Sequence, residues 1–212
     1  MRLSKKSKIS KKLTFKEISR PINLNELNKL IKIIKSENRS SILANLSKKN
    51  IDRYLQEVIK SKNLKLFVVI KKNITGYAII AKKPDFLISD FEKFKYLFFF
   101  DLFFSIKFII LFNIVVSKLR LDILFEKISQ KKTFLESTNL NLLGIEKEQQ
   151  SKGIGKNFLK YIFKHSNYKN KYITCETDNS RSKNFYQKKF KFKLIGKKIR
   201  FPISMDIMAK RF

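Results

Sequence analysis

Apolar residues in the first third of the chain recur with two different spacings. From Leu24 to Ile34 they return every three or four positions, which predicts a helix capped by Asn23 or Asn25. A second helix is predicted over about 49–60 by the same spacing.

Short continuous apolar runs alternate with these helical segments and predict strands. One run covers 13–18, and two more cover 66–70 and 74–81. Between the last two stands Lys71-Lys72-Asn73, a polar stretch that predicts a hairpin turn.

The second half of the chain alternates strand and helix patterns. An apolar run over 140–145 is followed by apolar residues at helical spacing from Phe158 to Phe163, and a further run over 172–177 precedes another helical stretch. Two closing strands are predicted over 192–198 and 204–210. Helices and strands are thus mixed along one chain, which predicts an α/β fold of the α+β type.

Length and composition fit one domain. A chain of 212 residues can bury a sizeable core, and five glycines and three prolines are too few for a linker. The single Cys175 excludes an intramolecular disulfide and fits a reducing compartment. Residues 1–12 are basic and polar, so they predict a disordered tail and show no secretory signal.

A glycine-rich turn links the 140–145 strand to the helix after it. It reads Gln150-Ser151-Lys152-Gly153-Ile154-Gly155. The first N–H groups of a helix lack intrahelical partners and the helix dipole favours negative charge, so such a junction is a candidate anion site. Glycines let a phosphate approach the backbone where a Cβ would block it.

A second motif follows the next strand. Asn179 stands six residues before the pair Phe185-Tyr186. Together with Gln150, Gly153 and Gly155, these residues resemble the two signature motifs of the GNAT superfamily of acyl-CoA-dependent N-acyltransferases. The order of predicted elements matches that family too.

The resemblance implies the fold of the whole chain beyond its tail. It implies a GNAT-like central mixed, mostly antiparallel sheet flanked by helices over 13–212. It leaves 84–135 as a phenylalanine-rich, apolar helical insertion between the third and fourth strands.

The resemblance also implies an acetyl-CoA site with no metal. Main-chain groups of the fourth strand would contact pantetheine and the thioester, and the turn would bind the pyrophosphate. Asn179 would bind the CoA arm or an intervening water. The cofactor-binding residues implied are Leu143, Gly144, Ile145, Gln150, Ser151, Lys152, Gly153, Ile154, Gly155, Lys156 and Asn179.

Tyr186 is the candidate general acid, because a phenol can protonate a thiolate leaving group of comparable basicity. The family often places a glutamate early in the fourth strand, and the aligned residue here is Asn139, which cannot take a proton. Glu136 and Glu176 are therefore both candidate bases. His165 is expected at a helix C-terminus, away from the thioester.

One departure from the family lies after Tyr186. Relatives carry Gly-Phe where the helix turns into the sixth strand, whereas this chain has a lysine before either Phe190 or Phe192. The turn must then differ in length or place a lysine at positive φ.

The formal charge of +31 has two explanations. Abundant Lys, Asn, Ile and Phe follow from A/T-rich codons, and the 48 Lys and Arg residues are spread along the chain. The alternative is a preference for acidic partners, namely CoA, a phosphorylated substrate or an anionic membrane. The lack of a single basic tract makes nucleic acid an unfavoured partner.

The insertion contains an apolar stretch over 97–116 that is long enough to span a bilayer. A single crossing would separate two neighbouring strands of one sheet, so three alternatives remain. The segment packs on the domain or on a second subunit as in a homodimer, contacts a membrane surface through 91–120, or forms a hairpin through the bilayer.

The function expected is transfer of an acetyl group from acetyl-CoA to an amine acceptor in the cytoplasm, in association with a membrane if 91–120 contacts one. An amino sugar or another small or membrane-proximal substrate is the favoured acceptor. The alternatives are a longer-chain acyltransferase and a non-catalytic basic module that binds membrane or nucleic acid.

Overall fold

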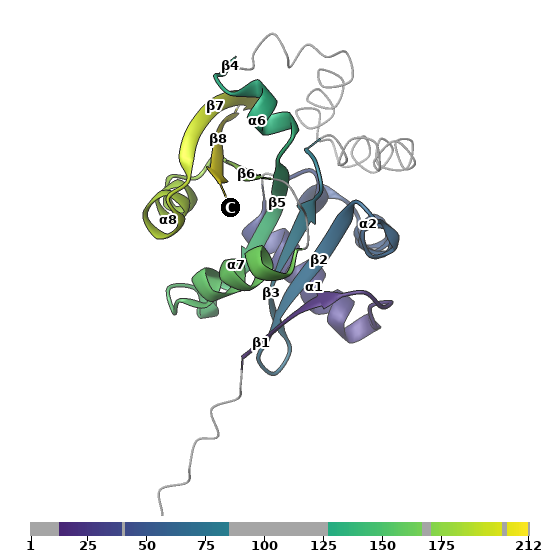
Figure 1. The fold of residues 1–212 in the computed structure, drawn as a ribbon. Coiled ribbons are helices and arrows are strands. Elements are labelled where there is room, and N and C mark those ends of the chain that lie inside the picture. Colours follow the sequence, from purple (N-terminus) through teal and green to yellow (C-terminus); the bar gives the residue numbers. More distant parts are fainter. Residues whose placement is uncertain (1–12, 40, 85–126, 167–170, 201–202, 212) are drawn as a thin grey trace, which may run out of the picture.

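A computed structural model describes residues 13–39, 41–84, 127–166, 171–200 and 203–211 of the chain (Figure 1). The strands are β1 Thr14–Ile18, β2 Leu64–Ile70, β3 Ile74–Ala81, β4 Lys127–Ile128, β5 Thr138–Ile145, β6 Tyr172–Thr177, β7 Lys193–Arg200 and β8 Ile203–Arg211. The helices are α1 Leu24–Glu37, α2 Lys48–Lys60, α6 Lys131–Leu135, α7 Ile154–His165 and α8 Ser180–Phe190, with 3₁₀ turns at Leu43–Asn45 and Lys147–Gln149.

The described strands form one sheet in the order β1-β2-β3-β5-β6-β8-β7-β4. Their pairings are antiparallel, apart from the parallel pairing of β5 with β6. The mixed, mostly antiparallel sheet predicted from the sequence is therefore confirmed.

Helices cover both faces of the sheet, so its central strands are buried on both sides. In β2, Leu66 and Val68 pack with α1 and α2, whereas the alternate residues Phe67 and Val69 pack with α7. Figure 1 shows α7 crossing one face and α1 lying on the other. This double coverage explains why β2 and β3 are mostly apolar on both faces instead of alternating between apolar and polar residues.

Side-chain caps explain where the first two helices begin. Asn23 Oδ1 accepts a hydrogen bond from the Glu26 N–H at 2.9 Å, which identifies Asn23 and not Asn25 as the cap of α1. The Ser47 hydroxyl accepts from the Asn50 N–H in the same way at the start of α2.

Part of the predicted insertion lies in the described chain. Lys127–Ile128 pairs with β7 at the edge of the sheet, and Lys131–Leu135 forms α6. The apolar stretch over 97–116 lies outside the described residues, as does the tail over 1–12. Within the described ranges no helix is long and apolar enough to cross a membrane.

The turn after α8 shows how the chain accommodates a lysine at the position where the family usually has glycine. Lys191 is the C-cap residue of α8 and lies at φ 59°. The next residue, Phe192, is buried. A lysine therefore occupies the left-handed conformation that glycine usually takes, as one of the two predicted solutions requires.

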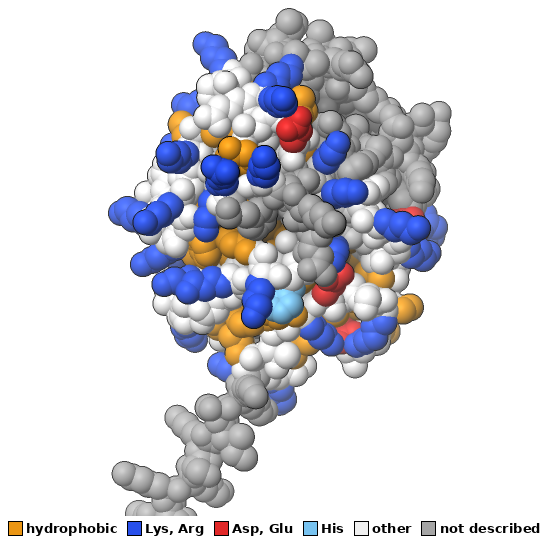
Figure 2. Space-filling view, in the orientation of Figure 1, with side chains coloured by type: hydrophobic (Ala, Val, Ile, Leu, Met, Phe, Trp, Pro, Cys, Tyr) orange, Lys and Arg blue, Asp and Glu red, His pale blue; other side chains and the backbone are white. Residues whose placement is uncertain are grey.

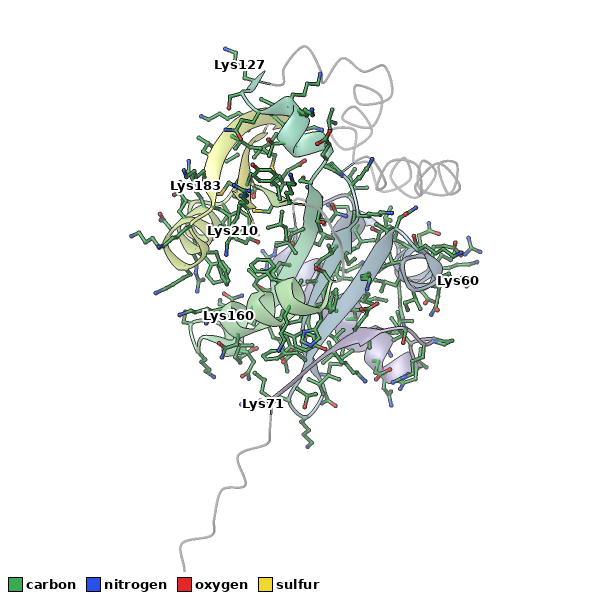
Figure 3. All side chains as sticks on the ribbon, in the orientation of Figure 1. Lys60, Lys71, Lys127, Lys160, Lys183 and Lys210 are labelled. Carbon is green, nitrogen blue, oxygen red and sulfur yellow. The ribbon has the colours of Figure 1, made fainter. Side chains whose placement is uncertain are left out.

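Basic side chains are distributed over many elements of the described fold. Figure 2 shows lysines and arginines scattered across one face without a single dense patch. The labelled lysines of Figure 3 come from α2, the β2–β3 turn, β4, α7, α8 and β8, namely Lys60, Lys71, Lys127, Lys160, Lys183 and Lys210. This distribution is that of a generally basic surface.

Candidate acetyl-CoA site

Two adjoining strands separate at the centre of the sheet. The β5–β6 ladder runs from Thr138–Ile173 to Leu140–Cys175 and ends there within the described chain. On the other side of β5, the register with β3 shifts between Leu140 and Leu142, so Asn141 is the extra residue of a β-bulge. The splayed fourth strand implied by the family resemblance is therefore present as β5.

The glycine-rich turn follows β5 after the 3₁₀ turn Lys147–Gln149, and its last two residues, Ile154 and Gly155, begin α7. Gly153 lies at φ 76°, in the left-handed region, and no described side chain caps this helix. Ser151 is also left-handed, at φ 60°. The opening N–H groups of α7 are thus left without a side-chain acceptor, which is the condition for an anion site at a helix N-terminus.

Gly153 is suited to this position by conformation and by space. A Cβ added there would meet no heavy atom within 4 Å. Gly155 differs, because a Cβ at that residue would be in ordinary contact with the Phe185 ring at 3.6 Å. The first glycine therefore leaves open space at the turn, whereas the packing against α8 leaves room for a Cβ at the second.

Gln150 holds the turn in place. Its Nε2 donates to the Ile145 carbonyl at 2.7 Å and to the Glu37 carboxylate at 2.6 Å. The side chain therefore connects the turn to the end of β5 and to the end of α1. Lys152 and Lys156 are exposed beside the turn, where their charges are available to an anion.

Gly144 is required by packing within β5. A Cβ there would lie 2.6 Å from the Tyr77 ring and 3.1 Å from the Asn38 amide. Asn38 Nδ2 donates to the Tyr77 hydroxyl at 2.7 Å, so the two side chains that lie over Gly144 also hold each other in place. The Ile145 side chain is buried in the core around α7, and the Leu143 side chain is partly buried against that core.

The second motif begins α8 beside the turn. Asn179 Oδ1 accepts from the N–H groups of Arg181 and Ser182, at 2.8 and 3.4 Å, and so caps the helix. The Arg181 guanidinium donates to the Ser151 hydroxyl at 3.1 Å. Arg181 thus adds a positive charge to the turn, although neither sequence motif includes it.

A groove of two adjoining parts runs between the end of α1 and these two motifs. One part, of about 380 Å³, is lined by residues that include Glu37, Gln150 and Arg181. The other, of about 500 Å³, extends past Glu37 to Asp178 and Asn179. Gln150 of the first motif and Asn179 of the second therefore line a common groove, whose opposite wall is α1.

Tyr186 is buried in the core between α8 and the sheet. Its ring lies 5.4 Å from those of Phe185 and Phe192, and no described residue hydrogen-bonds its hydroxyl. Burial raises the pKa of the Tyr186 phenol well above its usual value, and Cys175 adds to the rise. The phenol is therefore protonated at neutral pH, as a proton donor must be.

Cys175 lies in the core strand β6 as expected, fully buried. Burial raises the pKa of its thiol well above the usual value, with Glu176 contributing. The thiol therefore stays protonated, which makes it a weak nucleophile.

The two candidate bases occupy different ends of the β5–β6 ladder. Glu176 follows Cys175 in β6, one position beyond the last pair, where the strands separate. Glu136 is exposed at the end of α6, before the ladder begins. Asn139 lies within the ladder and is buried, with its Nδ2 donating to Thr174 Oγ1 at 3.1 Å.

His165 also lies in the described chain, at the end of α7. His165 is the last residue of α7, where its ring stacks on Tyr161 at 4.1 Å and Nδ1 lies 2.8 Å from the Tyr161 carbonyl. Among the described residues, no group of three or more His, Cys, Asp and Glu is arranged to hold a metal ion.

Comparison with known proteins relates this chain to solved structures only through its fold. No family model matches the sequence. No curated protein matches it either. Solved structures do match over nearly their whole length, and several are acetyltransferases.

An acetyltransferase from Thermus thermophilus aligns with a TM-score of 0.55 and 12% identity over 94% of this chain and 97% of its own. A GNAT family acetyltransferase from Elizabethkingia anophelis with acetyl-CoA bound aligns at 0.52 and 15%, over 94% and 98%. A GNAT family acetyltransferase from Streptococcus pneumoniae aligns at 0.53 and 13%, over 95% and 100%. The chain therefore has the GNAT fold, as its motifs predicted.

Proposed function

We propose that this protein is an N-acetyltransferase that moves an acetyl group from acetyl-CoA to an amine. The observation that supports this most is the position of the uncapped, left-handed turn at Gly153. It follows β5, the strand that separates from β6, after one short 3₁₀ turn. A phosphate site and an opening in the sheet are thus adjacent, as a long ligand with a pyrophosphate at its middle requires.

The pyrophosphate of CoA would accept hydrogen bonds from the N–H groups of the turn over 150–156. The left-handed Gly153 and the absence of a described cap on α7 support this assignment. Arg181, Lys152 and Lys156 would add positive charge to it. The pantetheine arm would then lie along β5, against the backbone of Leu143, Gly144 and Ile145.

The reaction is direct attack of a neutral amine on the thioester carbonyl. As the tetrahedral intermediate collapses, the carbon–sulfur bond breaks and the thiolate leaves with the electron pair. Tyr186 would then give its proton to that sulfur. Its burial in the α8 core supports this role, because a desolvated site also raises the pKa of a thiolate and so eases the transfer.

Glu176 is the better placed of the two candidate bases. It lies where β5 and β6 separate, whereas Glu136 lies on the far side of the ladder and is exposed. We therefore assign the removal of the amine proton to Glu176, directly or through a water, and keep Glu136 as the alternative.

The acceptor would enter through the groove between α1 and the two motifs. The charge of this groove does not by itself select an amine, because acidic and basic side chains line it in equal number. The acidic ones are Glu37, Glu146, Glu148 and Asp178, and the basic ones are Lys32, Arg39, Lys147 and Arg181. An amino sugar or a membrane-proximal amine stays the favoured acceptor from the sequence.

A thermal-shift titration tests the proposal. Acetyl-CoA, longer acyl-CoAs and free CoA are titrated at low and high salt, with inorganic tripolyphosphate as a control polyanion. At a hundredfold excess over its Kd, a ligand adds about 2.7 kcal/mol to the free energy of unfolding, or roughly 5–10 °C in Tm. We expect saturable stabilisation by acetyl-CoA that persists at high salt.

Two results would count against the proposal. An equal shift with tripolyphosphate would mean that the turn binds any polyanion, and a shift abolished by salt would mean that the attraction is only to the basic surface. The best-bound acyl chain identifies the donor and so separates an acetyltransferase from a longer-chain relative.

A further inference from the structure

Asn141 is a buried amide with no hydrogen-bond partner in the described part of the chain. Both Oδ1 and Nδ2 are inaccessible to solvent, and neither has a partner among the described residues. Because both atoms are unpaired, the conclusion holds for either orientation of the amide. Buried polar side chains are nearly always paired, so an exception in a core strand requires an explanation.

The neighbouring Asn139 shows that β5 can satisfy such a side chain. Its Nδ2 donates to Thr174 Oγ1 at 3.1 Å, and the same hydroxyl lies 2.6 Å from Ser137 Oγ. Asn139 belongs to the β5–β6 ladder, whereas Asn141 is the bulge residue just beyond it. The unpaired amide of Asn141 therefore lies where β5 and β6 begin to separate.

The position of Asn141 relates it to the reacting end of a bound acyl-CoA. From Ile145, beside the glycine-rich turn, β5 runs back about 13 Å to Asn141, at about 3.3 Å per residue. A pantetheine arm that starts at the turn and follows β5 ends in its thioester near the inner limit of the opening. Asn141 and Glu176 occupy that limit, on β5 and β6 respectively.

We propose that the Asn141 side chain binds the thioester of acyl-CoA, with Nδ2 donating to the thioester carbonyl oxygen. This inference rests on the proposed function. A donor held at this oxygen also stabilises the negative charge that develops there when the amine attacks. Oδ1 remains as an acceptor for an N–H group of that amine.

The variant Asn141→Leu tests the inference, because leucine has nearly the volume of asparagine but no polar atom. Isothermal titration of the full chain gives the Kd of acetyl-CoA, free CoA and adenosine 3′,5′-bisphosphate, which lacks the pantetheine arm. We expect acetyl-CoA to bind about tenfold more weakly, the effect of one lost hydrogen bond. Free CoA and the bisphosphate should bind within twofold of wild type.

The same variant should be more stable than wild type when no ligand is present. It removes an unpaired buried amide, so we expect its Tm to rise by about 3 °C. The matched control Asn139→Leu breaks an existing hydrogen bond and should lower Tm, without a selective loss of acetyl-CoA over CoA. Asn141→Ala provides a smaller second variant, with the same expected selectivity.

Distinct outcomes overturn distinct claims. Wild-type affinity for acetyl-CoA in both Asn141 variants would remove the residue from the thioester site. Equal losses for CoA and acetyl-CoA would move its contact to the pantetheine arm and also overturn the assignment. Wild-type protein that binds neither ligand would instead refute the proposed function itself.

Discussion

Two neighbouring helices, α7 and α8, begin in opposite ways. At α8 the Asn179 side chain accepts hydrogen bonds from two of the opening N–H groups. At α7 the equivalent residue is Gly153, which has no side chain to offer and takes a left-handed conformation. The helices α1 and α2 are capped by side chains as α8 is.

The two signature motifs look equivalent in the sequence, but this difference in helix capping gives them different structural roles. The first motif leaves backbone donors available, which is the property of a binding site. The second satisfies its own donors and is anchored to the first through Arg181 and Ser151. We therefore expect substitutions at α7 to act mainly on ligand affinity, and substitutions at the α8 cap to act mainly on stability.

The largest effect is expected from charge at the α7 turn. Gly153→Asp should weaken CoA binding about a hundredfold or more, because a carboxylate would lie close to the pyrophosphate. Gly153→Asn is the matched control, since asparagine has the same size and also tolerates positive φ. Titration of both variants with CoA isolates the charge, and similar affinities would show that no phosphate lies at this turn.

Tyr186→Phe should lower kcat roughly a hundredfold and leave the Kd of CoA within twofold, because the hydroxyl acts only on the leaving thiolate. Thiol release from acetyl-CoA, with the best amine of a panel of small primary amines, gives the rate. Since burial raises the pKa of this phenol, wild-type kcat should show no fall caused by Tyr186 below about pH 10. An unchanged kcat in the variant would remove Tyr186 from the reaction.

Arg181→Gln should weaken CoA binding about fivefold, because it removes one partly screened positive charge from the turn. Lys189→Gln, exposed further along α8, removes the same charge away from Ser151 and controls for the general basic surface. Equal losses in the two variants would show that Arg181 has no special place at the site.

The smallest effect on binding is expected at the α8 cap. Asn179→Ala should lower the free energy of unfolding by about 1 kcal/mol, or about 2–4 °C in Tm, as loss of a cap does. Asn23→Ala, at the cap of α1, should cost the same. CoA affinity should change less than threefold in Asn179→Ala. A tenfold loss there, absent in Asn23→Ala, would assign Nδ2 of Asn179 to the CoA arm and end the contrast between the two helices.

Local sequence patterns predicted most elements and both motifs. The hairpin turn at 71–73, the buried Cys175 and the lysine at positive φ all follow from residues close in sequence. These features depend on the chain within a few positions, where apolar spacing and turn chemistry apply.

Contacts between distant residues could not be predicted in this way. Gln150 binds Glu37, which lies 113 positions earlier, and Lys127–Ile128 adds to the edge of β7 from within the predicted insertion. Neither contact leaves a periodic signal. Asn141 likewise looks in the sequence like any polar residue in a strand. Only the three-dimensional structure reveals that it lacks a partner among the residues described.

The short β5–β6 ladder also affects how the sheet opens during local unfolding. It is the one described hydrogen-bonded connection between the strands β1, β2, β3 and β5 and the strands β6, β8, β7 and β4. A ligand along β5 would add contacts beside this seam and join the two groups of strands more firmly. Amide hydrogen exchange in the β5–β6 ladder would then slow as the ligand concentration rises. The concentration of the ligand would in this way affect how cooperatively the two groups of strands open.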